Sequence, residues 1–289
     1  MAEGRVGMPA SGDAAAPRER RFRLRAGAEV GTLESGPARA GGPPRLPLVL
    51  VPGVGGAKEL FAGLLPHLAA ERRVVAVDLS PRVAPGRGVL ASAADDLVEL
   101  LDALELPCAD LLGQSFGAVV SARAWRRRPE RLRRLVLAAP ATPPAGLAGA
   151  RAVARWLVLG SAVRLWPRGR RRGLERFVRG AGGYAIEPEL AGESFDALVE
   201  RVRRIDAAAL ARRLLALLGH SWRRELADLT APLLIVEGDL EAALLPRSVM
   251  GFFRTRPGTR LVTLPGGHMP FLVRPEGFAR AVLEFLDSP

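Results

Sequence analysis

Short segments that are apolar at all or nearly all positions alternate along this chain with longer amphipathic segments. A strand that is apolar throughout is buried on both faces, and amphipathic helices between such strands supply the cover. This order constrains the fold more than any other feature, because parallel strands need a helical crossover to join them. The apolar segments are residues 48–51, 74–77, 109–112, 135–137, 233–236 and 261–264.

The alternation predicts an α/β fold with a mostly parallel, doubly wound sheet. Helical segments such as 93–104 and 278–286 separate or follow the apolar runs. Residues 21–25 and 29–34 are predicted to form an opening antiparallel hairpin. Residues 1–20 consist of Gly, Ala, Pro and charged residues without periodicity, so we expect a disordered tail there.

The alternation stops between residues 141 and 225, where helix-like stretches follow one another with no strand between them. This arrangement predicts an all-helical cap over the site, with an apolar pocket beneath it. The cap divides the core of the fold into residues 21–140 and 226–289. The basic run 168–172 is interpreted as a solvated linker, with a rim that faces an anion as the alternative.

Composition limits the partners and the cofactors. The formal net charge is +12, and Lys58 is the only lysine, so the positive charge is carried by arginine. A GC-rich genome accounts for this bias, and a basic surface that attracts anionic substrates or lipid headgroups is the alternative. With one tyrosine and no interleaved aromatic residues, we expect no nucleic-acid partner.

A single cysteine, Cys108, excludes an internal disulfide framework and a cysteine-based metal cluster. We expect neither a metal nor another cofactor. No early segment resembles a signal peptide, and no run of about 20 residues is free of charge. These features favour a cytoplasmic protein whose partner is a small-molecule substrate, and they leave the oligomeric state open.

A Gly-x-Ser-x-Gly sequence at residues 113–117 lies between an apolar run and a helix-like run. A strand, a sharp turn that carries a serine and then a helix form a nucleophile elbow. Strand and helix come close together at such a turn, so Gly113 and Gly117 are needed to avoid clashes. The pattern predicts that Ser115 is a nucleophile and that the N–H of Phe116 faces an oxyanion.

A serine nucleophile needs a base, and the chain has only three histidines. His67 lies in a helix-like segment, where a surface or packing role is expected. His220 lies at the end of a cap helix, where capping is the expected role. His268 follows the apolar segment 261–264 in a Gly-rich loop, so it is the predicted base.

The base in turn needs a carboxylate that orients it. Segment 233–236 ends in Glu237-Gly238-Asp239-Leu240-Glu241, which supplies several candidates. Glu237 is nearest the strand and is expected to point sideways. Glu241 and Asp239 both lie in the loop at the strand's C-terminal end, and both are kept as candidates for the acid.

The loop that follows segment 48–51 reads Pro52-Gly53-Val54-Gly55-Gly56. We call residues 52–56 the oxyanion loop. Its glycines, beginning with Gly53, let the backbone approach a substrate, and the N–H of Val54 is the predicted second oxyanion donor.

Taken together, the chain resembles the α/β-hydrolase superfamily from about residue 22 to 287. The matching features are the oxyanion loop, the Val-Asp-Leu strand end at 77–79, the elbow at 113–117, the turn at 238–241 and Gly267-His268. The resemblance places the acid between serine and histidine in chain order, and position 241, three residues after Gly238, is where this superfamily often has its acid.

One feature departs from many members of the superfamily, which have His-Gly where this chain has Pro52-Gly53. The Pro-containing loop, the cap pattern and the sequence around His268 are similar to the maspardin-like branch. That branch is associated with binding and lacks the triad histidine, whereas this chain has His268.

The resemblance and the residues together predict a serine hydrolase that cleaves an ester or a thioester through an acyl-enzyme. The apolar cap indicates a substrate with an apolar group. The alternatives are a binding or adaptor protein on a hydrolase scaffold, or another reaction of the fold such as C–C bond hydrolysis or acyl transfer.

Overall fold

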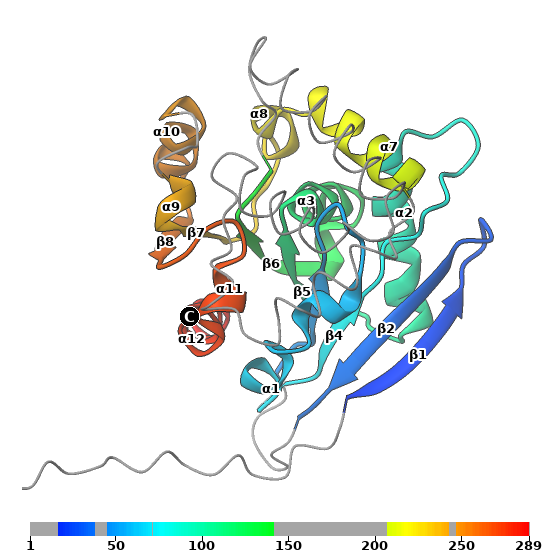
Figure 1. The fold of residues 1–289 in the computed structure, drawn as a ribbon, viewed down its shortest axis with the longest axis horizontal. Coiled ribbons are helices and arrows are strands. Elements are labelled where there is room, and N and C mark those ends of the chain that lie inside the picture. The colour runs from blue at the N-terminus through cyan, green and yellow to red at the C-terminus, as the bar shows by residue number, and fades with distance from the viewer. Residues whose placement is uncertain (1–16, 38–44, 71, 142–206, 243–246, 289) are drawn as a thin grey trace, which may run out of the picture.

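Figure 1 shows the computed structural model of the chain, which describes residues 17–37, 45–70, 72–141, 207–242 and 247–288. Within these residues one sheet has the strand order β1-β2-β4-β3-β5-β6-β7-β8. The strands are β1 (Arg18–Arg23), β2 (Glu29–Ser35), β3 (Leu48–Val51), β4 (Val74–Val77), β5 (Ala109–Gln114), β6 (Leu132–Ala138), β7 (Leu233–Gly238) and β8 (Thr259–Leu264).

The pairing pattern confirms the predicted α/β fold with a mostly parallel sheet. Strands β3 to β8 pair in parallel, whereas β2 pairs antiparallel with both β1 and β4. The predicted opening hairpin is therefore present. Strand β1 begins at Arg18 rather than at residue 21, because Arg18 pairs with Glu34 in the register of the hairpin.

The central strands are apolar because both of their faces are covered. Every residue of β3, β4, β5 and β7 is buried, whereas β8 at the edge of the sheet is only partly buried. Continuous apolar sequence is expected for strands that have no solvent face. The C-terminal ends of β3, β5, β7 and β8 meet at one edge of the sheet, where ligands bind in open α/β folds.

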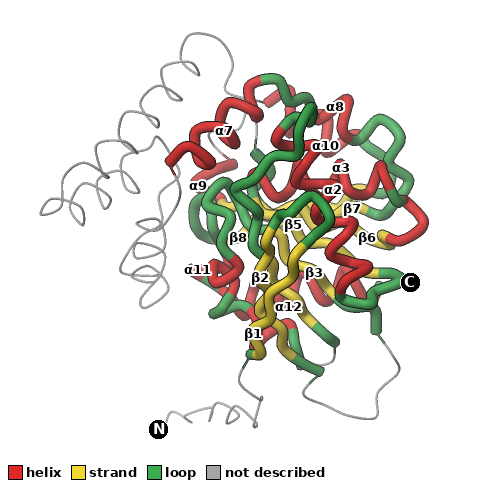
Figure 2. Tube along the Cα trace, turned by 90° about the vertical axis from the view of Figure 1, so that its right-hand side faces the viewer, coloured by secondary structure: helices red, strands yellow, loops and turns green. Residues whose placement is uncertain are grey.

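Helices cover both faces of the sheet (Figure 2). Helices α2, α3, α7, α8 and α10 contribute to one buried cluster, and α1, α11 and α12 contribute to the other. The bounds are α1 (Leu65–Leu68), α2 (Val89–Ala103), α3 (Phe116–Arg127), α7 (Ala207–Leu218), α8 (Trp222–Glu225), α9 (Asp239–Ala242), α10 (Arg247–Thr255), α11 (Pro270–Val273) and α12 (Pro275–Asp287), with 3-10 turns η1 (Lys58–Phe61) and η2 (Pro129–Arg131). Among the described residues, no helix has the length and apolar character to cross a membrane.

Most of the predicted cap, residues 142–206, lies outside the described residues, as do residues 1–16 of the predicted tail. The last part of the cap range is described, and it contains the helices α7 and α8. Helix α7 packs against α2, and α8 packs against α3. Leu217 and Trp222 join the same buried cluster as α2 and α3, so this part of the chain is fixed to the core.

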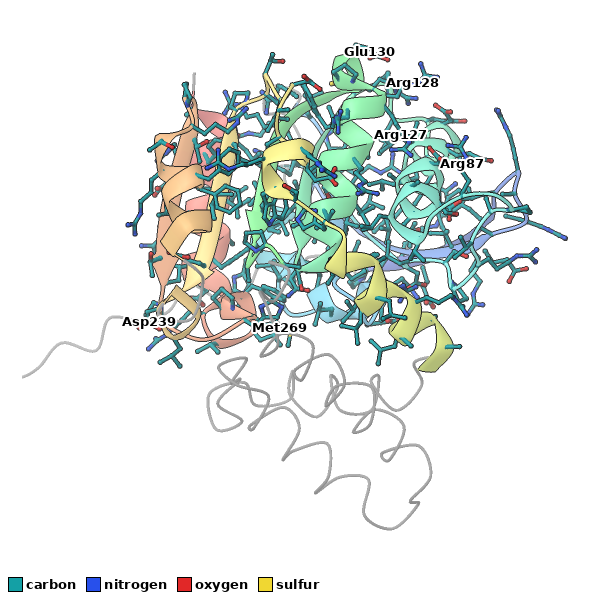
Figure 3. All side chains as sticks on the ribbon, turned by 90° about the horizontal axis from the view of Figure 1, so that it is seen from above. Arg87, Arg127, Arg128, Glu130, Asp239 and Met269 are labelled. Atoms are coloured by element: carbon teal, nitrogen blue, oxygen red, sulfur yellow. The ribbon has the colours of Figure 1, made fainter. Side chains whose placement is uncertain are left out.

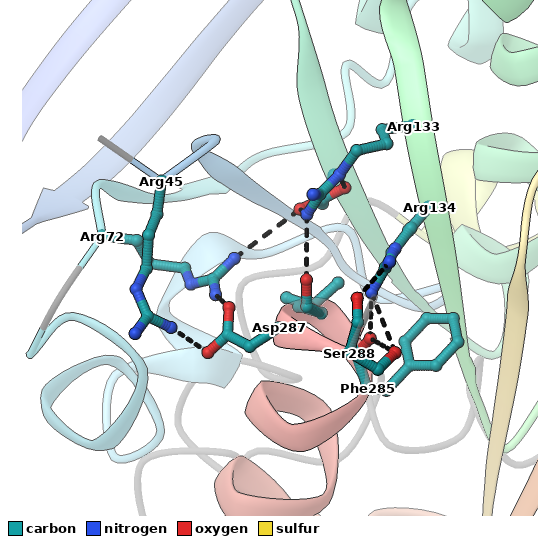
Figure 4. A network of polar contacts seen from close by, with 9 residues as sticks. Arg45, Arg72, Arg133, Arg134, Phe285, Asp287 and Ser288 are labelled. Atoms are coloured by element: carbon teal, nitrogen blue, oxygen red, sulfur yellow. Dashed lines mark hydrogen bonds and ion pairs between the residues drawn. The ribbon is translucent and has the colours of Figure 1, made fainter. Parts of the chain in front are cut away.

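Several of the arginines form a polar network at the edge of the sheet where the parallel strands begin, opposite the edge where their C-terminal ends meet (Figure 4). Arginines there hold the end of α12 through carboxylates and backbone carbonyls. The donors are Arg72, Arg133 and Arg134, and the acceptors are the carboxylates of Asp110 and Asp287 and the carbonyls of Phe285, Leu286 and Ser288. Buried charge of this kind is tolerated because each guanidinium has acceptors.

Candidate active site

Ser115 occupies the turn between β5 and α3, where the strand–turn–helix order was predicted. Its backbone has φ 53° and ψ −112°, and the residue is buried, with 7% of its surface exposed. A positive φ at a residue with a Cβ is strained, and such strain concentrates at functional sites. The turn therefore has the backbone conformation expected of a nucleophile elbow.

The glycines on either side of Ser115 are required by close backbone contact. A Cβ added to Gly113 would lie 2.6 Å from the Cα of Ala118, and one added to Gly117 would lie 2.5 Å from the carbonyl oxygen of Pro52. Real Cβ atoms do not approach other atoms so closely. Strand, helix and oxyanion loop thus converge on the elbow, as the spacing of the glycines predicts.

The oxyanion loop lies directly against Ser115. A Cβ added to Gly53 would lie 3.4 Å from the Cβ of Ser115. The loop closes on itself as a turn, because the N–H of Gly56 donates to the carbonyl of Gly53 at 2.9 Å. Gly56 has φ +68°, a conformation that glycine adopts at no steric cost.

The N–H groups of Val54 and Phe116 are available as donors in the described part of the chain. Neither N–H has an acceptor among the described residues. Phe116 is the first residue of α3, so its N–H has no partner within the helix and lies at the positive end of the helix dipole. An oxyanion hole requires two such donors beside a nucleophile, and this role of the two N–H groups stays a prediction.

His268 lies in the loop between β8 and α11, which we call the histidine loop (residues 265–269). The amide nitrogen of Gln114 donates to the backbone carbonyl of His268 at 3.4 Å. Gln114 directly precedes Ser115, so this bond brings the histidine loop to the elbow. His268 is half-buried, and its ring contact with Ser115 remains a prediction.

Asp239 begins α9 (Figure 3), and its carboxylate anchors the histidine loop. Its Oδ1 accepts from the N–H of Gly266 at 2.9 Å and from the N–H of Leu240 at 2.8 Å. Gly238 is packed just as closely, because a Cβ added there would lie 2.7 Å from the carbonyl carbon of Gly266. The loop after β7 and the loop after β8 are therefore joined.

Glu241 also lies in α9, but its side chain is outside what the structure describes. Glu237 is buried in β7, and its Oε1 accepts from the hydroxyl of Thr263 on β8 at 3.2 Å. This contact agrees with the expectation that Glu237 points sideways, toward the neighbouring strand. The choice between Glu241 and Asp239 as the acid stays a prediction, although Asp239 already has a different use.

Comparison with known proteins gives the family. Residues 48–281 match the alpha/beta hydrolase family. This chain is an α/β hydrolase by family. The likeness to the maspardin-like branch that the Pro52 loop indicated stays an expectation.

This α/β hydrolase has several characterised relatives. It is 31% identical to the dihydrolipoyllysine-residue acetyltransferase component of the acetoin cleaving system of Pseudomonas putida, over 85% of this chain and 65% of that protein. It is 29% identical to the pimeloyl-[acyl-carrier protein] methyl ester esterase of Neisseria meningitidis serogroup B, over 83% of this chain and 92% of that protein. The crystal structure of a hydrolase from Pseudomonas aeruginosa PA01 aligns with a TM-score of 0.69 and 27% identity, over 96% of this chain and 99% of that one. The chain thus spans less than two thirds of the acetyltransferase component.

Two supports of the hydrolase site were not found from the sequence. The indole N–H of Trp222 donates to the carbonyl of Ala141 at 2.9 Å, and the N–H of Ala141 donates to the carbonyl of Ser115 at 3.3 Å. Arg213 on α7 contacts the oxyanion loop and is treated below. The sequence around a tryptophan or an arginine on an amphipathic helix does not indicate which distant residue it will contact. These two contacts could therefore not be predicted from the sequence.

His220 packs in the interior of the protein and does not cap a helix. It is buried between α7 and α8, its ring is edge-on to Trp222, and its Nδ1 lies 3.5 Å from Oε1 of Glu225. Arg123 on α3 donates to the same carboxylate oxygen at 2.6 Å and 2.9 Å. The group ties α8 to α3.

Proposed function

We propose that this α/β hydrolase cleaves an ester or a thioester by nucleophilic catalysis at Ser115. The observation that carries the proposal is the strained elbow, with the oxyanion loop and the histidine loop both in contact with it. Backbone strain of this kind concentrates at functional sites, and a nucleophile elbow presents its serine at the edge of the sheet where a substrate binds.

The proposed reaction runs through an acyl-enzyme. The Oγ of Ser115 attacks the carbonyl carbon while His268 takes the hydroxyl proton, and the N–H groups of Val54 and Phe116 stabilise the oxyanion. Collapse of the tetrahedral intermediate expels the alcohol or thiol, which receives the proton from His268. Water then enters with His268 as its base, and the acid is released. Glu241 is the proposed orienting carboxylate, and Asp239 is the alternative.

The relatives support the reaction class and leave the substrate open. The Neisseria protein is named as a methyl ester esterase, which is the chemistry proposed here. We propose a small-molecule substrate with an apolar group, bound beneath a helical cap, and a cytoplasmic location. No further cofactor enters the proposed steps.

A fluorophosphonate probe tests the nucleophile directly, because it forms a covalent bond only with an activated serine. The wild type should be labelled, and Ser115→Ala should not. Ser121→Ala is the matched control, since Ser121 is a buried serine on α3 and should leave the labelling unchanged. Equal labelling of wild type and Ser115→Ala would contradict the assignment, and an unlabelled wild type would favour the adaptor alternative.

Acyl transfer is the second candidate, because the Pseudomonas putida relative is named as an acetyltransferase component. Both reactions share the acyl-enzyme and differ in the group that accepts the acyl chain. The test measures how a p-nitrophenyl ester's acyl group divides between water and an added thiol. Hydrolysis predicts free acid as the main product, whereas transfer predicts the new thioester.

A further inference from the structure

Arg213 on α7 binds the oxyanion loop through the carbonyl of Val54. Its side chain is buried, with the residue only 5% exposed. Its Nη1 donates to the carbonyl of Val54 at 2.8 Å, and its Nη2 donates to the carbonyls of Leu79 at 2.7 Å and Ser80 at 3.1 Å. One guanidinium thus joins the oxyanion loop to the segment that follows β4.

The bonds of the loop fix the peptide groups on both sides of Val54. The carbonyl of Gly53 accepts from Gly56, which sets the peptide plane that carries the Val54 N–H. The carbonyl of Val54 accepts from Arg213, which sets the next peptide plane. Because peptide groups are planar, the bond to Gly53 sets the direction of the Val54 N–H, and the bond from Arg213 holds the backbone on the other side of Val54 against rotation.

Only an arginine fits this place. A guanidinium offers several N–H donors in a rigid planar fork, whereas an ammonium offers a point charge on a flexible stem. The guanidinium also lies close against the loop, since a Cβ added to Gly56 would lie 2.9 Å from Cζ of Arg213. The N–H of Leu79 donates to the carbonyl of Gly56 at 2.9 Å, which adds a second link between the same two segments.

We propose that Arg213 is a positioning residue for the oxyanion hole, and that it holds the Val54 N–H in the direction the transition state needs. This inference rests on the proposed function, because it assigns Val54 as a donor. An oxyanion donor acts more strongly on the transition state than on the bound substrate. Loss of the clamp therefore lowers kcat and leaves KM nearly unchanged.

Arg213→Lys tests the clamp, with Arg212→Lys as the matched control. Arg212 is the neighbouring arginine on the same helix, it is exposed, and it makes one bond to the carbonyl of Pro81 at 3.1 Å. On a p-nitrophenyl ester, Arg213→Lys should lose about 10- to 100-fold in kcat, less than the loss of a whole oxyanion donor. Arg212→Lys should keep the wild-type kcat.

Affinity for an alkyl boronic acid separates positioning from a purely structural role. The boronate forms a tetrahedral adduct with serine that carries a negative oxygen, so its binding reports the oxyanion hole. Arg213→Lys should weaken boronate binding by the same factor as kcat while the melting temperature stays within a few degrees. Arg213→Ala should recover part of its kcat when guanidinium is added well below denaturing concentration.

The outcomes separate the inference from the proposed function. A wild type that the fluorophosphonate probe does not label overturns both. A labelled wild type with unchanged kcat in Arg213→Lys overturns the positioning role alone, as does an equal loss in Arg212→Lys. If Arg213→Lys does not fold, Arg213→Gln replaces it, and a folded Arg213→Gln with wild-type boronate affinity overturns the inference.

Discussion

The elbow half of the site, around Ser115, is held by backbone packing, whereas the histidine half, around His268, is held by hydrogen bonds between loops. The strand and helix of the elbow are buried, and Gly117 leaves no space for a methyl group. The strand that leads to His268 is a partly exposed edge strand. Asp239, whose carboxylate anchors the histidine loop, is exposed.

This difference predicts how each half responds to substitution. Packing contacts in a close-packed interior cannot be changed one at a time without moving their neighbours. Polar bonds between exposed loops are individually weak, so one can be removed while the fold remains. Substitutions in the elbow half should therefore act on stability, and those in the histidine half should act on the rate.

The acid of the histidine half gives the largest expected effect on the rate. Glu241→Gln should lower kcat on the order of 10⁴-fold, by analogy with the loss of the orienting carboxylate in other triads. Asp239→Asn should stay close to wild type, because an amide oxygen still accepts from the N–H groups of Gly266 and Leu240. Steady-state kinetics on a p-nitrophenyl ester measure both.

The reverse pattern would make Asp239 the acid and Glu241 a bystander. Asp239→Ala adds a control for the anchor, because it removes the acceptor as well as the charge. A loss in Asp239→Ala that Asp239→Asn does not share would assign Asp239 to the loop alone. Wild-type rates in all three variants would place the acid elsewhere in the chain.

Gly117→Ala tests the elbow half, and its effect should appear in stability. The new Cβ would lie 2.5 Å from the carbonyl oxygen of Pro52, so backbone has to move. We expect a loss of about 3 kcal/mol or more in the free energy of unfolding, measured by urea denaturation. Gly219→Ala is the control, since nothing lies within 4 Å of an added Cβ there. A folded Gly117→Ala variant of wild-type stability would refute the packing argument.

Gly238→Ala makes the same change in the histidine half and should act mainly on the rate. Its Cβ would press on the carbonyl group of Gly266 and shift the histidine loop. A misplacement of about 1 Å costs on the order of 10²-fold in rate, and the histidine loop, which is partly buried and follows a partly exposed strand, should yield with less loss of stability than the elbow. Gly277→Ala in α12 is the control, with its nearest neighbour 4.0 Å away. An unfolding loss as large as that of Gly117→Ala, with kcat unchanged, would remove the distinction between the halves.

The elbow half was predicted in detail from the sequence, because each of its features leaves a local mark. The sheet, the hairpin, the turn at Ser115 and the close approaches at Gly113 and Gly117 all follow from residues within a few positions of one another. A strained turn needs its glycines at fixed spacing whatever the rest of the chain does. The start of β1 was placed too late because its charged residues hide a strand that is defined by its pairing.

The supports of the site were not predicted, because they connect segments that lie far apart in sequence. Arg213 reaches the oxyanion loop, and Trp222 reaches Ala141, only after the chain has folded. The anchoring role of Asp239 was hidden for the same reason, since its acceptor geometry depends on Gly266. Local pattern thus predicts the elbow and its turn, whereas tertiary contacts decide how they are held.

The smallest expected effect is on how the stability of the elbow half depends on pH, through Glu225 on α8. Burial raises the pKa of Glu225, but hydrogen bonds from His220 and Arg123 outweigh it and hold the pKa below its ordinary value of 4.5. A carboxylate whose folded pKa is lowered stabilises the protein above the unfolded pKa, and this contribution is lost as the pH falls through the folded value. Glu225→Gln should therefore cost about 1 kcal/mol at pH 7, and the difference from wild type should shrink below pH 4.5.

Urea denaturation of both proteins between pH 7 and pH 3 measures this difference. Asp228→Asn is the control, because Asp228 pairs with Arg126 near α8 but is 73% exposed in its side chain. An exposed pair of this kind contributes about 0–1 kcal/mol, so little pH-dependent difference is expected.

Because α8 also carries Trp222, which supports Ser115 through Ala141, the labelling rate of Glu225→Gln should fall along with its stability. A constant difference at every pH would show that Glu225 acts through packing alone, and the elbow half would then have no titrating support.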